Sequence, residues 1–391
     1  MKDSELLNTN KVKKETDYIA HPDPNINGTD HQSVKDHLFE VSELAGMFAS
    51  KIGQKQVGEI LGLLHDFGKY SQSFQAYVKS ATGIINPDED DFVDAKGLKG
   101  KIDHSTAGAQ WLYQHLAAQA RSVYKDQSCM EFKLALAVIQ ILPLCIASHH
   151  SGLIDNLASD KGQGFSARLQ KLEINSYFQE CCKSAEKEVL SQAKGLVTQE
   201  LIVSIVDQLK LICSNVSETE QAFYLGMYCK FMFSCLIDAD RINSADFETP
   251  ENRSSRNCKP EWGIAVQRVE NFVAGLKNRN KIDEIRRDIS NHCLNRAPEA
   301  QGIYSLSVPT GGGKTYSSLR YAVHHAKQHK LDRILYVIPY TSIIDQNAAA
   351  IREVLELEGD VIPWVLEHHS NLEPEQQTWH SKLVSENWDA P

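Results

Sequence analysis

Residues 61–78, LGLLHDFGKYSQSFQAYV, carry a histidine and an aspartate side by side at the end of an apolar run. The apolar residues of this run recur at helical spacing, at Val57, Ile60, Leu61 and Leu64. Gly68 is placed to end the helix, so His65 and Asp66 lie at its C-terminal end. Polar side chains in such a place are costly to bury unless they are paired or coordinate a metal.

Five more side chains of the same two kinds in the first 250 residues are candidate ligands: His37, His104, His149, His150 and Asp240. Imidazoles and carboxylates are the usual ligands of first-row divalent metals. Asp66 lies between two helices and can bridge two ions. We therefore expect one metal at His37, His65, Asp66 and Asp240, and a second at Asp66, His104, His149 and His150. Asp238 remains an alternative to Asp240 as the last ligand.

Two metals at close range can activate water and hold both oxygens of a phosphodiester displacement. Asp66 is then the central catalytic residue. Lys69, one helical turn past His65, is expected to steady a phosphate or the leaving group. The nitrogen-rich ligand sets favour Mn, Fe, Co or Ni over Mg, which prefers oxygen ligands.

The first part of the chain is predicted to be all-α. Residues 1–30 are polar and are expected to be a flexible N-terminus, and residues 31–250 form the domain that carries the histidines. After the helices that begin near Val34 and Val57, further helices are predicted around 105–119, 131–149, 164–192, 198–213 and 218–241. The turn-rich residues 242–261 mark the boundary of this domain.

The pattern changes in the second part of the chain. Residues 251–301 are predicted to be a linker with two helices, and residues 302–391 alternate predicted strands with helices, which is typical of a parallel α/β sheet. The predicted strands are Tyr304–Val308, Arg333–Ile338 and Val361–Leu366. After the first of them comes the glycine-rich loop of Thr310, Gly311, Gly312, Gly313, Lys314 and Thr315. A strand, such a loop and then a helix predict a P-loop that binds ATP and Mg²⁺.

Composition restricts which partners and which cellular compartment the protein can have. Residues 1–250 hold 24 basic and 33 acidic residues, a net charge of −9, which disfavours bulk attraction to nucleic acid unless bound metals add positive charge.

The nine cysteines include no Cys-x-x-Cys pair and indicate reduced thiols in a cytoplasmic protein. The most apolar run, Leu134–Ala147, is too short to span a membrane, so we expect a buried helix and no membrane association.

Five motifs carry a family resemblance. HDFGKYSQSFQAYV at 65–78, DHSTAGA at 103–109 and SHHSGL at 148–153 resemble the HD nuclease domain of the CRISPR-associated helicase-nuclease of type I systems. PTGGGKT at 309–315 and RILYVIPYTSII at 333–344 are similar to superfamily 2 helicase motifs. The order of nuclease before helicase and the residues YVIPYT at 336–341 are most similar to subtype I-C. The resemblance implies an all-α HD-type metal-dependent phosphohydrolase domain, followed by a RecA-like helicase lobe.

The function implied by the resemblance is a metal-dependent nuclease that cleaves DNA, preferably single-stranded, in antiviral CRISPR interference. In such proteins cleavage is coupled to ATP-driven 3'-5' helicase activity after recruitment by an RNA-guided surveillance complex. No Asp-Glu-x-His motif follows the P-loop in these 391 residues, so the helicase lobe is expected to be incomplete here and ATP hydrolysis negligible. Two other functions remain open: hydrolysis of small or cyclic nucleotides, and non-catalytic binding of DNA or the effector complex.

Overall fold

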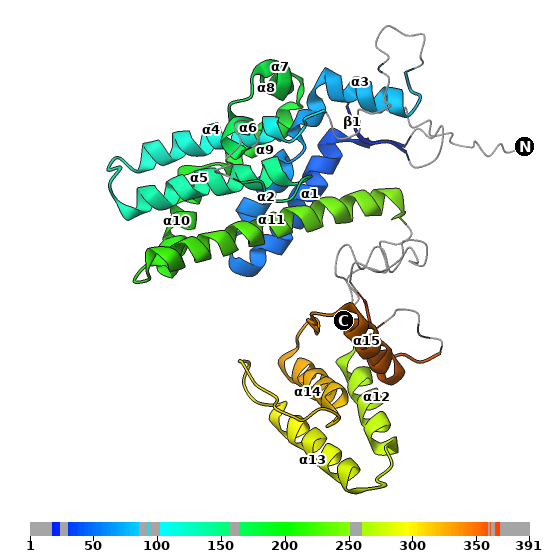
Figure 1. Ribbon diagram of the computed structural model, residues 1–391. Helices are drawn as coiled ribbons and strands as arrows, with labels where there is room; N and C mark the ends of the chain where they lie inside the picture. Colours follow the sequence, from blue (N-terminus) through cyan, green and yellow to red (C-terminus); the bar gives the residue numbers. More distant parts are fainter. Residues whose placement is uncertain are drawn as a thin grey trace, which may run out of the picture. The chain divides into compact units, whose positions relative to one another are not determined.

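A computed structural model describes residues 18–23, 30–85, 93, 102–155, 164–250, 260–358, 360 and 364–367. The chain forms two compact units, Met1–Pro250 and Glu251–Pro391, and each is described by itself. Figure 1 shows the first unit as a bundle of long helices and the second as a smaller group of helices.

The first unit is built almost entirely from helices around one hydrophobic core. Its α-helices are α1 (Val34–Ala49), α2 (Lys55–Leu64), α3 (Gln72–Ala81), α4 (Thr106–Val123), α5 (Met130–Ser148), α6 (Phe165–Leu169), α7 (Glu173–Ser176), α8 (Phe178–Ser184), α9 (Lys187–Leu196), α10 (Gln199–Cys213) and α11 (Glu218–Glu248). Two short 3-10 helices are η1 (Ser50–Ile52) and η2 (Phe67–Tyr70). This agrees with the all-α domain predicted from the sequence.

Helices α1 and α2 pack unusually closely, and this brings two of the histidines together. Gly58 and Gly62 lie one turn apart on α2, and a Cβ atom on Gly62 would lie 2.6 Å from the Cα atom of Ser42. A side chain there would push α1 away. Because both positions are glycine, His37 on α1 can reach His65 at the end of α2.

Helices α5 and α11 are both long and apolar enough in composition to cross a membrane. Most of α5 is buried inside the first unit, however, and its core residues include Val138, Leu142 and Ile146, each with no exposed surface. The prediction of a buried helix at Leu134–Ala147 is therefore confirmed.

Two predicted helices have different bounds in the structure. The single helix expected over 164–192 is broken into α6, α7, α8 and part of α9, and Tyr177 between α7 and α8 takes the left-handed conformation at φ 54°. The helix expected to end near 241 continues to Glu248. Spacing of apolar residues does not reveal a chain reversal such as the one at Tyr177, because the reversal itself requires no change in periodicity.

Part of the predicted flexible N-terminus is ordered. Strand β1 (Ile19–His21) pairs in antiparallel fashion with β2 (Gln32–Ser33). The Gln75 side chain accepts from the Ile19 N–H at 2.9 Å and donates to the Ile19 carbonyl at 3.0 Å. The prediction was wrong here because these tertiary hydrogen bonds, which leave no local pattern, fix the strand. Residues 1–17 and 24–29 lie outside the described residues.

The second unit contains α12 (Trp262–Gly275), α13 (Lys281–Arg296), α14 (Lys314–His329) and α15 (Thr341–Leu355). The predicted strands at Tyr304–Val308 and Arg333–Ile338 do not form in the structure. A strand requires a partner for its backbone hydrogen bonds, and within the described part of this unit neither segment has one. Several of their apolar side chains are exposed to solvent, with Val337 92% exposed. Of the third predicted strand, Val361–Pro363 lie outside the described residues, and the remainder is not a strand.

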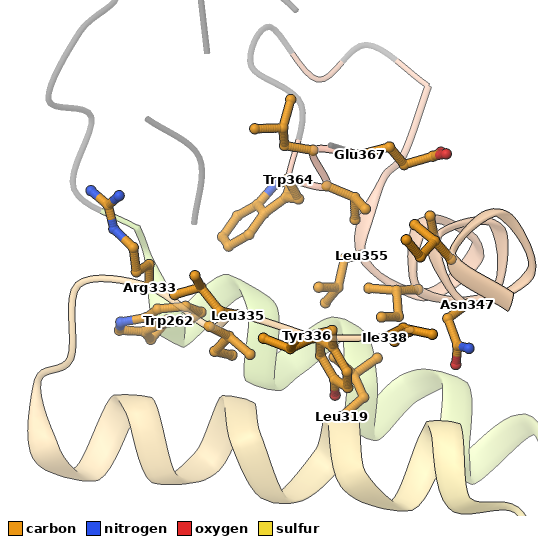
Figure 2. Close-up of a pocket in the computed structure, with 17 residues that line it drawn as sticks. Trp262, Leu319, Arg333, Leu335, Tyr336, Ile338, Asn347, Leu355, Trp364 and Glu367 are labelled. Carbon is orange, nitrogen blue, oxygen red and sulfur yellow. The ribbon is translucent and has the colours of Figure 1, made fainter. Parts of the chain in front are cut away.

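A cavity of about 300 Å³ lies beside the segment 333–338. Figure 2 shows its wall of mainly apolar side chains, with Trp262, Leu319 and Leu355 on the helices and Trp364 on the segment that follows α15. The Trp262 indole donates to the Leu331 carbonyl at 2.6 Å, which fixes the start of α12 against the beginning of the loop after α14.

Candidate metal centre

The structure brings all seven predicted ligands together in the two predicted groups. Group 1 consists of His37, His65, Asp66 and Asp240, and group 2 consists of Asp66, His104, His149 and His150. In each group one ligand atom from every residue lies within 4.8 Å of the others. The residues come from the ends of α2 and α5, the start of α4, and the interiors of α1 and α11.

Asp66 belongs to both groups, with one carboxylate oxygen for each. Its Oδ2 atom lies 3.2 Å from His37 Nε2 and 3.3 Å from His65 Nε2. Its Oδ1 atom lies 3.1 Å from His149 Nε2 and 3.7 Å from His104 Nε2. This division of the two oxygens is the arrangement that a bridging ligand requires.

The last ligand of each group completes the two sets. Asp240 Oδ1 lies 3.5 Å from His37 Nε2 and 3.4 Å from His65 Nε2. His150 Nε2 lies 3.8 Å from Asp66 Oδ1 and 2.5 Å from His104 Nε2. Asp240 rather than Asp238 is the α11 carboxylate in group 1.

Hydrogen bonds at Nδ1 fix the orientation of four of the imidazole rings. The Nδ1 atoms of His65, His104 and His149 lie 2.7 to 3.0 Å from the backbone carbonyls of Gly62, Ile102 and Ile146. A carbonyl can only accept, so Nδ1 carries a proton in each of these rings, and Nε2 is the nitrogen that can bind a metal once it is deprotonated. The fourth ring, that of His37, is held by the Asn243 side chain. All four Nε2 atoms point inward, so the donor set fits divalent metals.

Asn243 is a functional residue that the sequence analysis missed. Its Oδ1 atom lies 2.7 Å from His37 Nδ1, and its Nδ2 atom donates to Glu40 Oε2 at 2.6 Å. Gln32 donates to both Asn243 and Glu40, each at 2.9 Å. Asn243 lies three residues after Asp240 on α11, so both side chains lie on the same face of that helix.

Lys69 lies inside the centre, as its position after the His-Asp pair predicted. Its Nζ atom is 2.7 Å from Asp66 Oδ2 and donates to the Ala20 carbonyl at 3.3 Å. The pKa of Asp66 is lowered, because burial is outweighed by the charges of Lys69 and His65 and by hydrogen bonds from His149 and His150. Asp66 is therefore a carboxylate, the form that binds metal.

Gly68 lets group 2 assemble. Its N–H donates to the His104 carbonyl at 2.9 Å, and a Cβ atom at this position would lie 2.5 Å from both the Cα and the carbonyl oxygen of His104. The loop that carries Asp66 can approach His104 because residue 68 has no side chain.

The histidines of the centre differ in how easily they are protonated. Burial opposes protonation of His65, but Asp66 and Asp240 outweigh it and raise the pKa of His65 to about 10. Burial lowers the pKa of His104 to about 4 and also lowers the pKa of His149. Two adjacent carboxylates therefore need positive charge between them, which is what a divalent cation supplies in such sites.

The ligands are buried to different degrees, which shows where the centre opens. The side chains of His37, His65, Asp66 and His149 are at most 1% exposed, whereas Asp240 and His104 are 15% exposed and His150 is 52% exposed. The centre therefore opens to solvent on the side of His150, in group 2.

His21 also lies beside the centre, although its segment was predicted to be flexible. Its ring centroid is 4.7 Å from that of His37, and its Nε2 atom is 3.4 Å from the Ser244 hydroxyl. Burial, together with the nearby charges of Lys69 and His37, lowers the pKa of His21 to about 2. It therefore forms part of the wall as a neutral imidazole. No local signal in the sequence points to this position.

Of the six P-loop residues, Thr310–Gly313 form a turn ahead of α14, and Lys314 and Thr315 are the first two residues of that helix. Gly311 and Gly313 have φ of +80° and +79°, and Gly313 precedes the first residue of the helix, Lys314. The loop is held by Arg286, whose Nε donates to the Gly311 carbonyl at 2.9 Å. The Thr315 hydroxyl donates to Asn347 at 3.0 Å. Beside the loop lies a cavity of about 530 Å³, which Gly311, Gly313, Lys314 and Thr315 line with residues of α12, α13 and the segment between them.

A helical bundle with two adjoining His/Asp groups that share one aspartate defines a metal-dependent hydrolase. The comparisons agree. Residues 30–227 match the family model described as Cas3, HD domain, and residues 266–384 match the model described as Type III restriction enzyme, res subunit, a helicase-type domain. The chain belongs to the Cas3 HD domain family and has the order of a Cas3-like nuclease-helicase. No curated protein matches the chain.

Proposed function

We propose that the HD domain is a metal-dependent nuclease that cleaves DNA, with single strands preferred, in type I CRISPR interference of subtype I-C. The observation that carries the proposal is the division of the Asp66 oxygens between two ligand groups, beside an opening at His150. When bound there, two divalent ions supply an activated water and neutralise the phosphodiester charge.

The residues of this chain have separate roles in the proposed reaction. His37, His65, Asp66 and Asp240 hold one ion, and Asp66, His104, His149 and His150 hold the other. Lys69 balances the Asp66 charge and, since its Nζ lies inside the centre, can donate to a phosphate oxygen. The five nitrogen ligands favour Mn, Fe, Co or Ni over Mg.

We propose further that the P-loop binds ATP with Mg²⁺. Lys314 stands at the N-terminus of α14, where backbone N–H groups and the helix dipole favour phosphate. The proposed setting is the cytoplasm, where an RNA-guided surveillance complex recruits the protein to DNA.

The test combines metal analysis with cleavage assays on purified protein. We expect about two divalent ions for each chain, and metal-dependent degradation of single-stranded DNA at a higher rate than duplex DNA. Cyclic nucleotides serve as the alternative substrates. If they are hydrolysed and DNA is not, the HD domain is a small-nucleotide phosphohydrolase and the nuclease proposal is wrong. If wild-type protein binds DNA without cleaving it under any metal, the non-catalytic alternative holds.

A further inference from the structure

The nuclease function leaves open how an acidic domain holds a DNA strand. Residues 1–250 have a net charge of −9, and the cation deepest in the centre, Lys69, is already paired with Asp66. Contacts to phosphates position a nucleic acid on a protein. A strand therefore needs a cationic side chain near the His150 opening that no carboxylate of the protein neutralises.

Arg168 on α6 lies next to the segment that supplies His104 to group 2. Its Nη1 atom donates to the Ser105 hydroxyl at 3.1 Å. Ser105 follows His104 in the chain, and its hydroxyl also lies 3.5 Å from the carbonyl of Ala147, two residues before His149. Arg168 is thus anchored between the two segments that supply the histidines of group 2.

The carboxylate beside Ser105, that of Asp103, already has other partners. Asp103 accepts hydrogen bonds from the backbone N–H groups of Ser105 and Thr106, and Lys171 forms an ion pair with it. Among the residues that the structure describes, Arg168 has no carboxylate within ion-pair distance. Its guanidinium is half-buried and uses one of its five N–H donors on Ser105.

We propose that Arg168 is a substrate-binding residue that holds a phosphate next to the scissile one, on the His104 and His150 side of the metal centre. This rests on the proposed nuclease function and adds a binding site for the strand outside the metal ligands. A planar guanidinium can bind a phosphate through two hydrogen bonds.

The first experiment compares Arg168→Ala, Arg168→Lys and the control Arg121→Ala on two substrates. Arg121 lies in the last turn of α4, at the opposite end of that helix from Ser105. The substrates are a single-stranded DNA oligonucleotide and bis(p-nitrophenyl) phosphate, a diester without neighbouring phosphates. For Arg168→Ala we expect KM for DNA to rise roughly tenfold with little change in kcat, since a charged hydrogen bond is lost. Hydrolysis of the small diester should not change.

Arg168→Lys should recover part of the DNA affinity, because it keeps the charge but not the bidentate geometry. Arg121→Ala should behave as wild type on both substrates. An equal loss of activity on DNA and on the small diester would show that Arg168 supports the fold, and would overturn the proposal.

The second experiment measures DNA binding without cleavage, by fluorescence anisotropy in EDTA at several salt concentrations. Each phosphate contact on a single strand contributes about 0.7 to the slope of log Kd against log salt. We expect Arg168→Ala to lower that slope by about this amount. If wild type hydrolyses the small diester but not DNA, the nuclease proposal fails and the Arg168 proposal with it. If wild type cleaves DNA while Arg168→Ala has unchanged KM and slope, the Arg168 proposal alone is wrong.

Discussion

Asn243 on α11 fixes the ring of His37 on α1, with 2.7 Å between Asn243 Oδ1 and His37 Nδ1. The amide oxygen accepts the Nδ1 proton, and this leaves His37 Nε2 free as a ligand. The same amide donates to Glu40, so its own orientation is also fixed. A residue that is not itself a ligand thus determines which nitrogen faces group 1.

Asn243→Ala should weaken metal binding about 10- to 100-fold, the usual effect of removing such a support. Asn243→Asp should retain most of the affinity, because it keeps an oxygen acceptor at the same place. Titration of Mn²⁺ into the protein, followed by calorimetry, measures both. Equal affinity of wild type and Asn243→Ala would show that packing alone orients His37.

Asp66→Ala should abolish DNA cleavage, with a loss of at least about 10³-fold, because both ions lose their shared ligand. Circular dichroism should show an unchanged helical fold. Asp238→Ala is the matched control, since Asp238 lies on α11 two residues before Asp240. Normal cleavage by Asp66→Ala with added Mn²⁺, or loss of cleavage in Asp238→Ala equal to that in Asp240→Ala, would contradict the ligand assignment.

Gly68→Ala should impair group 2 more than group 1. The added methyl group would overlap the His104 backbone and push the η2 segment away from it, which costs about 1–3 kcal/mol of stability. Metal analysis should therefore find close to one ion for each chain in the variant. Gly83→Ala serves as a control for glycine removal in the same region, since a Cβ atom there meets nothing within 4 Å, although its φ is +75°. Two fully bound ions in Gly68→Ala would show that the loop adjusts without loss.

Much of the centre could be predicted from the sequence because its ligands sit at helix ends or on helical stripes. His65 and Asp66 follow an apolar run, and His149 and His150 end another. The residues that surround and orient the ligands were harder to predict. His21 reaches the centre on a three-residue strand that Gln75 holds from 56 residues away, and such a contact leaves no local periodicity. Asn243 shares a helix with Asp240, but an asparagine alone does not indicate a ligand support.

In the second unit, the sequence predicted strands that the described residues do not form. The segments Tyr304–Val308 and Arg333–Ile338 contain tyrosine and β-branched residues, which favour strands. Propensity acts within a segment, whereas a strand exists only through hydrogen bonds to a neighbour. In the described part of this unit neither segment has such a neighbour, so the strands that propensity predicts do not form.

Lys314→Ala should weaken ATP binding about tenfold or more, because it removes a charged contact to the outer phosphates. Lys327→Ala is the control, since Lys327 lies in the last turn of the same helix, α14. Fluorescence of a labelled ATP analogue in the presence of Mg²⁺ measures the Kd. Equal binding by wild type and Lys314→Ala would show that the loop does not hold the phosphates.

The stability of the second unit should depend on pH through Glu270. Arg320 lowers the pKa of Glu270 by direct hydrogen bonds, and His324 also lowers it. A lowered folded-state pKa means that this stabilisation is present above the usual value near 4.5 and is lost as pH falls below it.

Glu270→Gln should therefore destabilise the protein by about 2 kcal/mol at pH 7, because it leaves the buried Arg320 charge unpaired, and should destabilise it less at pH 3. Urea unfolding at both pH values measures the difference. Glu299→Gln removes the exposed pair with Arg296 and should cost less than about 1 kcal/mol at either pH. A Glu270→Gln effect that is as large at pH 3 as at pH 7 would exclude the charge as its cause.

Helix α11 has a mechanical consequence for the centre. It spans 31 residues, roughly 46 Å at the rise of an α-helix, and ends at Glu248, close to the last residue of the first unit. Asp240 and Asn243 both lie in its final turns, and both serve group 1. A helix is stiff along its axis, so tension or torque applied at its C-terminal end would displace these two residues together. The histidines of group 2 stay anchored to α4 and α5, and one half of the centre would shift against the other.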